Sequence, residues 1–255
     1  MGSGRSGTSM MAGVLAGAGY YMGARPMPAD FRSANPKGLF EDFEVSEINE
    51  ELLDPLFPTP ARTRWAQRRQ ARKTLGPGER WAATLPRDAV VSPSSELDAR
   101  IAALVATQPF CFKDPRFCYT LPAWRPHVED AVLVCVFREP ARTANSLVTE
   151  WQSADWRTYE MTFERGLAHW REAYRRVLDL RAMGGEWLFL HYDQILDGSG
   201  VGRLEATLGV SVDHEFPETS LNRSPVCGEV RDTETSIYER LCELAGAGAS
   251  QPLPR

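Results

Sequence analysis

Lysine is almost missing from this chain of 255 residues. Of its 29 basic residues only Lys37, Lys73 and Lys113 are lysines, so arginine carries nearly all of the positive charge. The formal net charge of −5 gives no general reason to expect a nucleic-acid partner, and any anion site must therefore be local. Hydrophobic residues make up 43% and charged residues 25% of the chain, which are ordinary globular values that argue against wholesale disorder.

Cysteine and histidine are scarce as well. The five cysteines include no CxxC pair, and the four histidines have no metal-ligand spacing. An odd cysteine count without a secretion signal favours reduced thiols in a cytoplasm. The apolar run at 10–18 is too short and too rich in glycine to span a bilayer. We therefore expect a cytoplasmic protein with no metal site and no transmembrane segment.

Glycine, by contrast, is concentrated at the start of the chain. In the stretch GSGRSGTS, glycines at 2, 4 and 7 alternate with small hydroxyl residues around Arg5. We call residues 2–7 the opening loop. It has the form G-x-x-x-x-G and precedes a predicted helix, and backbone amides in such a loop form an anion cradle with the helix dipole. The alternative is a frayed, glycine-rich terminus.

The opening loop lacks the lysine of a Walker A sequence. In NTP-hydrolysing proteins that lysine reaches the β- and γ-phosphates, beside a hydroxyl that holds Mg²⁺. Here Arg5 is the only cation inside the loop. This favours a ligand with one 5′-phosphate and a weakly charged terminal group, and it disfavours a nucleotide-dependent kinase.

Strands and helices alternate along the rest of the chain. We predict strands at 110–113, 131–137 and 187–192, and helices at 8–19, 45–57, 62–75, 95–107, 141–152 and 159–183. This order predicts an α/β fold of the P-loop type, with three layers and a central parallel sheet flanked by helices. A phosphate loop normally follows a buried strand. Only Met1 precedes this one, so we expect either a sheet without its usual first strand or a true start further upstream.

We expect a single domain at 1–245. Its helices and lid at 20–90 would form the acceptor side of a cleft, and a flexible tail would follow at 246–255.

A second motif follows the apolar run AVLVCVF. Arg138 stands at the end of this predicted strand, and Ser146 lies eight positions later in a helix. Both can converge on one phosphate, with bidentate geometry from the guanidinium. Two phosphate sites on one sheet imply a nucleotide phosphorylated at two distant positions. The alternatives are an ion pair between Arg138 and Glu139 and a solvated helical Ser146.

Together the two motifs resemble those of the sulfotransferases that use 3′-phosphoadenosine-5′-phosphosulfate (PAPS), especially bacterial members. GSGRSGTS resembles the family's 5′-phosphosulfate loop, and VFREPARTANS resembles its 3′-phosphate motif. Further segments resemble recurrent ones in the same order: NPKGLFED, FKDPRF, FLHYDQIL and SLNRSP. The resemblance implies metal-independent sulfuryl transfer from PAPS to a hydroxyl or amine of a small-molecule, glycan or lipid acceptor. A PAPS-binding protein without catalysis remains an alternative, and the acceptor and oligomeric state stay open.

The resemblance also implies roles for single residues. Arg5 would stabilise charge on the transferring group, and Arg138 and Ser146 would bind the 3′-phosphate. Tyr192 would contact adenine, and Arg223 would approach the nucleotide or the acceptor. The loop residues that would bind the 5′ end are Gly4, Arg5, Ser6, Gly7, Thr8 and Ser9.

Two further residues are candidates for catalysis. Glu41, before a predicted helix, would take the proton of the acceptor; the alternative is a first-turn acid that complements the helix dipole. Lys113 ends a predicted strand, where its side chain would face the ligand crevice and neutralise the leaving oxygen. The alternative for Lys113 is an ion pair with Asp114.

Overall fold

The computed structural model describes residues 1–28, 36–57, 75–76, 78–153, 159–221 and 224–247. Its α-helices are α1 (Thr8–Gly17), α2 (Phe43–Leu53), α4 (Ser95–Val105), α5 (Phe117–Trp124), α6 (Pro140–Gln152), α7 (Phe163–Ala182), α8 (Tyr192–Leu196), α9 (Ser199–Leu208) and α10 (Asp232–Ala245). Its strands are β1 (Leu133–Phe137) and β2 (Trp187–His191). Short 3₁₀ helices lie at Asp54–Leu56, Arg80–Ala82, Arg125–His127 and Thr219–Leu221.

The two strands form a parallel pair. The register runs from Leu133 opposite Trp187 to Phe137 opposite His191, and α6 and α7 make the connection between the strands. Both strands are continuous apolar runs, as expected of parallel strands covered on both faces. The predicted α/β class and parallel sheet are therefore confirmed, and two of the three predicted strands form.

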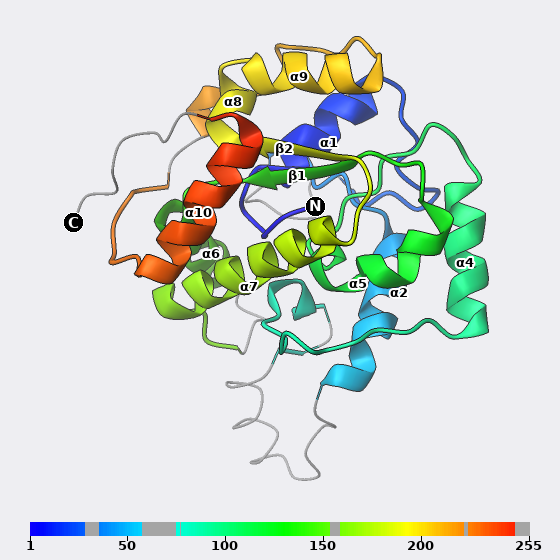
Figure 1. Cartoon of the computed structure of the whole chain (residues 1–255), viewed down its shortest axis with the longest axis horizontal. Helices are drawn as coiled ribbons and strands as arrows, with labels where there is room; N and C mark the ends of the chain where they lie inside the picture. The colour runs from blue at the N-terminus through cyan, green and yellow to red at the C-terminus, as the bar shows by residue number, and fades with distance from the viewer. Residues whose placement is uncertain (29–35, 58–74, 77, 154–158, 222–223, 248–255) are drawn as a thin grey trace.

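Alternate side chains of the strands pack into different clusters. Val136 and Leu190 pack with α1, α8 and α9 on one face, whereas Cys135, Phe137 and Phe189 pack with α5, α7 and α10 on the other. This alternation follows from the two-residue period of a strand. Figure 1 shows α8, α9 and α1 above the sheet, α7 below it and α10 along its left side.

The predicted strand at 110–113 does not form. Phe110 makes a single parallel bridge with Tyr21, in which the Tyr21 amide donates to Pro109 O at 2.8 Å and the Cys111 amide donates to Tyr21 O at 2.9 Å. A strand needs such bonds to repeat along its length. Within the described residues no second bridge continues this one.

The residues at the helix N-termini show where two of the predicted helices begin. Helix α2 begins at Phe43 rather than at 45, because the Asp42 carboxylate accepts the amides of Glu44 and Val45 at 2.8 and 3.2 Å and so caps the helix two residues earlier. Helix α6 begins at Pro140, one residue before the predicted start, and the proline stands at its first position. The predicted helix at 62–75 lies outside the described residues up to 74, as does the predicted tail from 248 on.

Among the described residues no helix combines the length and the apolarity that crossing a bilayer requires.

Candidate functional site

The opening loop touches its surroundings at its glycines. A Cβ atom on Gly2 would lie 2.2 Å from the carbonyl oxygen of Val136, and one on Gly4 would lie 2.4 Å from the Trp81 ring. Gly2 also has a backbone φ of +144°, a conformation that residues other than glycine rarely adopt. The loop is therefore pressed against the end of β1 and against Trp81, with no room for larger residues.

The start of α1 faces the same region. Gly7, with a left-handed φ of +94°, is the N-cap, and no side chain among the described residues caps the helix. The first turn holds no acidic residue, so its amide groups present partial positive charge without a capping oxygen. Ser9 lies inside the helix and is not its cap. Thr8 and Ser6 are buried.

Arg5 connects the opening loop to α6. Its backbone is left-handed, with φ of +68°, and its Nε donates to Ser146 Oγ at 3.1 Å. Its guanidinium also lies 3.5 Å from the carboxylate of Glu150, which is buried. Two segments 141 positions apart thus meet at a charged group.

Arg138 follows β1 directly and is buried. Its guanidinium lies 4.4 Å from the centre of the Tyr192 ring, and its Nη1 donates to Ser224 Oγ at 3.5 Å. Burial, together with the positive charges of Arg142 and Arg5, lowers the pKa of Arg138. A bound anion would relieve the repulsion among these three arginines.

The alternative interpretation of Arg138 was a surface ion pair with Glu139, but the Glu139 carboxylate binds backbone amides instead. Its carboxylate oxygens accept the amides of Ala141 and Arg142 at 2.9 and 2.6 Å and so cap α6. The N-terminus of α6 is therefore already occupied by an acid, unlike that of α1. Ser146 is buried rather than solvated, which removes the second alternative.

Tyr192 lies between the two motifs. It is the first residue of α8, and a Cβ on Gly7 would approach its Cδ2 atom to 2.6 Å. The guanidinium of Arg138 covers its ring. Tyr192 thus packs the opening loop against Arg138.

Glu41 and Lys113 form an ion pair, and both side chains are largely buried. Glu41 directly precedes the N-cap of α2, whereas the acid in the first turn of that helix is Glu44. The first-turn alternative for Glu41 is therefore wrong. The alternative for Lys113 is also wrong, because Asp114 binds Arg116 through its side chain at 2.7 Å and Lys113 binds Glu41.

The comparison with family models decides what these segments belong to. A model described as the sulfotransferase family matches residues 1–213 of the chain. The chain belongs to the sulfotransferase family. The matched range contains the opening loop, the Glu41–Lys113 pair, Arg138, Ser146 and Tyr192. Neither the curated proteins nor the solved structures contain a match.

In this sulfotransferase-family chain, several supporting residues had no signal in the sequence. The Tyr174 hydroxyl donates to Val136 O at 2.9 Å and accepts the amide of Ser3 at 3.3 Å, which holds the opening loop against β1. Trp81 packs on Gly4. Arg142, by contrast, stands inside the motif VFREPARTANS and could have been chosen there. Arg223 lies outside the described residues.

Proposed function

We propose that this protein transfers a sulfuryl group from PAPS to a hydroxyl or amine acceptor, by in-line displacement and without a metal. The observation that carries the proposal is the hydrogen bond from Arg5 to Ser146, since it joins the opening loop to the segment after β1. One nucleotide with phosphates at two positions can contact both segments. Membership of the sulfotransferase family supports the transfer of a sulfuryl group in general.

The residues of the site fit such a nucleotide. At the opening loop, Gly4 and Gly7 are positions where a Cβ would collide with Trp81 or Tyr192, so the bare backbone forms the cradle. The uncapped N-terminus of α1 offers amides of Thr8 and Ser9 to a 5′-phosphate. A bare glycine loop that opens an uncapped helix, together with the helix-covered parallel sheet, supports a P-loop-type fold.

The second phosphate has a separate group of donors. Arg138 and Ser146 would bind the 3′-phosphate, because Arg138 presents a buried guanidinium with lowered pKa and the Ser146 hydroxyl already receives a hydrogen bond from Arg5. An Arg–phosphate contact is charge-assisted and often bidentate, and it contributes about 1.5–3 kcal/mol. The ring of Tyr192, which packs against the Arg138 guanidinium, would fix the position of that guanidinium relative to the phosphate.

The chemistry requires a proton acceptor and positive charge. When bound, PAPS supplies the sulfuryl group, whose sulfur bonds to the acceptor oxygen or nitrogen as its bond to the 5′-phosphate oxygen breaks. Glu41 would accept the proton that the acceptor loses. Lys113, which is paired with Glu41, and Arg5 would stabilise the charge on the leaving phosphate oxygen. The ion pair also fixes the position of the Glu41 carboxylate.

Nucleotide-dependent stabilisation tests the donor. We expect adenosine 3′,5′-bisphosphate at a hundred times its Kd to raise the Tm without Mg²⁺ by about 5–11 °C, from about 2.7 kcal/mol of binding linkage. Adenosine 5′-monophosphate is the matched control and should give a smaller shift. A response to ATP with Mg²⁺ alone would favour a kinase and contradict the proposal.

Transfer of labelled sulfate separates an enzyme from a binding protein. The chain is incubated with ³⁵S-labelled PAPS and a library of phenols, glycans and lipids. We expect one acceptor class to take up the label. Binding of the bisphosphate without label transfer to any class would favour the binding protein. The acceptor side at 20–90 would select among these classes.

A further inference from the structure

Phe40, the residue directly before Glu41, has an unusual backbone conformation. Its φ is +53°, in the left-handed region that residues with a side chain rarely adopt and that is a genuine outlier for a bulky one. Within the described parts of the chain, the only other non-glycine residue with a positive φ is Arg5 of the opening loop. A conformation of this kind persists only where the surrounding contacts hold it. The contacts of Phe40 therefore determine the backbone from which Glu41 extends.

The ring of Phe40 lies on the bare backbone of helix α1. A Cβ on Gly13 of that helix would approach Cε2 of Phe40 to 2.8 Å and would collide with the ring of Phe216. The two rings meet edge to face, with their centres 5.7 Å apart and an interplanar angle of 75°. A side chain at position 13 would occupy the space of the rings, so glycine lets both of them reach the helix.

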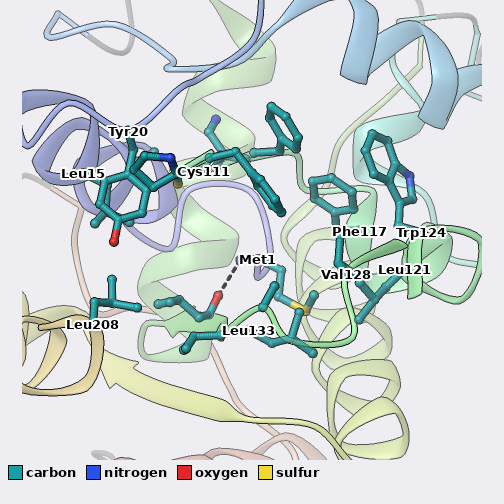
Figure 2. Close-up of a pocket in the computed structure, with 18 of the residues that line it drawn as sticks. Met1, Leu15, Tyr20, Cys111, Phe117, Leu121, Trp124, Val128, Leu133 and Leu208 are labelled. Atoms are coloured by element: carbon teal, nitrogen blue, oxygen red, sulfur yellow. Dashed lines mark hydrogen bonds between the residues drawn. The ribbon is translucent and has the colours of Figure 1, made fainter. Parts of the chain in front are cut away.

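The two rings contact α1 on the side away from its other apolar surface. Four residues of α1 line a cavity beside β1: Thr8, Met11, Ala12 and Leu15. Figure 2 shows Leu15 on the wall of this cavity. At about 100° per residue, Gly13 lies roughly 150° around the helix from the middle of that surface. The rings thus hold the far side of the helix whose first amides the proposed function assigns to the 5′-phosphate.

Phe216 is itself fastened to the segment that contains Phe40. The Lys37 ammonium donates to Phe216 O at 2.7 Å and lies 5.0 Å from the centre of the Phe216 ring. It also lies 3.1 Å from the Glu218 carboxylate. Gly38, with a φ of +99°, lets the backbone turn between Lys37 and Phe40. This segment therefore closes around Phe216, and the Phe40 ring is held by two elements that are far apart in the sequence.

After Phe40 the chain enters a short antiparallel pairing. The Met27 amide donates to Glu41 O at 2.8 Å, and the Phe43 amide donates to Arg25 O at 2.9 Å. The Glu41 carboxylate thus reaches its ion-pair partner from a backbone that is fixed on both sides. Because φ of Phe40 sets the direction in which the chain enters this pairing, an extended Phe40 would direct Glu41 away from its present position relative to α1.

We propose that Phe40 is a positioning residue for Glu41. Its ring, seated on Gly13 beside Phe216, holds the Glu41 carboxylate at a fixed distance from the start of α1. The inference rests on the proposed function, in which Glu41 takes the acceptor's proton and the start of α1 binds the 5′-phosphate. A base must lie within hydrogen-bond reach of that proton, and a displacement of about 1 Å can slow catalysis about a hundredfold. Phe40 thus acts on the rate of transfer, through Glu41, and not on nucleotide binding.

Two substitutions at Phe40 separate positioning from stability. Phe40→Ala and Phe40→Gly both remove the ring, and both should lower turnover with ³⁵S-labelled PAPS about ten- to a hundredfold, while the Kd for adenosine 3′,5′-bisphosphate stays within about twofold. Glycine adopts a positive φ without strain, so the Tm of Phe40→Gly should exceed that of Phe40→Ala by about 2–4 °C. The control is Trp187→Ala, because Trp187 is half-buried at the start of β2, at the end of the sheet opposite to Arg138. It should lower the Tm and leave turnover unchanged.

The same substitution in a Glu41→Gln background tests whether Phe40 acts through Glu41. There Phe40→Ala should lower turnover by less than about twofold, since the group that it positions no longer takes the proton. A purely structural role would lower turnover by the same factor in both backgrounds. Phe216→Ala removes the second ring and should behave in the same way, which provides the test if the Phe40 variants do not fold.

Three results would overturn this inference while leaving the proposed function in place. They are full turnover of the Phe40 and Phe216 variants, equal factors of loss in the two backgrounds, and a loss of nucleotide affinity as large as the loss of turnover. Full turnover of Glu41→Gln would instead exclude Glu41 as the base, and the inference would fall with it. Absence of label transfer to every acceptor class would overturn both the proposed function and the inference.

Discussion

Gly7→Ala should destabilise the protein through two separable effects. Gly7 has a φ of +94°, and a left-handed backbone costs alanine about 1–2 kcal/mol. The added Cβ would also lie 2.6 Å from Cδ2 and 3.1 Å from Cε2 of Tyr192, whose ring is covered by Arg138. Overpacking of this kind adds about 1–3 kcal/mol. The sum is about 2–5 kcal/mol, or a Tm decrease of about 4–20 °C.

Two glycines near the end of the same helix provide matched controls. Gly19 has a φ of +86°, and a Cβ added there would meet no atom within 4 Å, so Gly19→Ala should show the backbone cost of about 1–2 kcal/mol alone. Gly17 has an ordinary helical backbone and open space, so Gly17→Ala should stabilise the protein by about 0.5–1 kcal/mol.

Urea unfolding and calorimetric titration with adenosine 3′,5′-bisphosphate measure the two consequences. Stability should fall in the order Gly17→Ala, the unchanged chain, Gly19→Ala, Gly7→Ala. Only Gly7→Ala should weaken nucleotide binding, by tenfold or more, because it displaces both the opening loop and the ring beneath Arg138. Equal stability of the Gly7 and Gly19 variants, with unchanged affinity, would refute the argument.

The remaining predictions concern charge. In calorimetric titration, Arg138→Lys should weaken binding of the bisphosphate about ten- to a hundredfold. Arg87→Lys, at an exposed ion pair, is the control and should leave the affinity unchanged. Equal affinities of the Arg138→Lys variant and the unchanged chain would exclude Arg138 from the site. Glu41→Gln should lower turnover about 10²- to 10⁴-fold at unchanged nucleotide affinity, with the exposed Glu47→Gln as control; full turnover would exclude Glu41 as the base. Burial lowers the pKa of His169 to about 4, so the unfolded chain binds the proton first and stability is lost as the pH falls from about 6.5 to about 4. In urea unfolding, the difference in unfolding free energy between the unchanged chain and the His169→Gln variant should shrink as the pH falls over that range. A difference that stays constant with pH would contradict this.

The sequence predicted elements whose signals are local. The continuous apolar runs became β1 and β2, and Pro140 marked the start of α6. The cap of α2 could not be chosen in this way, because Asp42 and Ser46 are both good capping residues. Asp42 is selected by tertiary contacts: a Cβ on Gly23 would lie 2.2 Å from the Asp42 carboxyl carbon, which places the 23–25 segment directly over it.

The candidate site was predictable where sheet geometry brings segments together. An opening loop and the residue after a parallel strand belong to the same edge, so the approach of Arg5 to Ser146 follows the expectation that the two motifs converge. The partner of Lys113 was not predictable, because Glu41 is 72 positions away while Asp114 is adjacent. Tyr174 was also not predictable, because a helical tyrosine gives no sign that its hydroxyl will hold a loop.

A crystal structure with adenosine 3′,5′-bisphosphate tests most directly whether one nucleotide joins the two motifs. The account predicts the 5′-phosphate within hydrogen-bond distance of the amides at the start of α1 and the 3′-phosphate within that distance of Arg138 and Ser146. A nucleotide that contacts only one of the two segments, or that binds elsewhere on the chain, would contradict it.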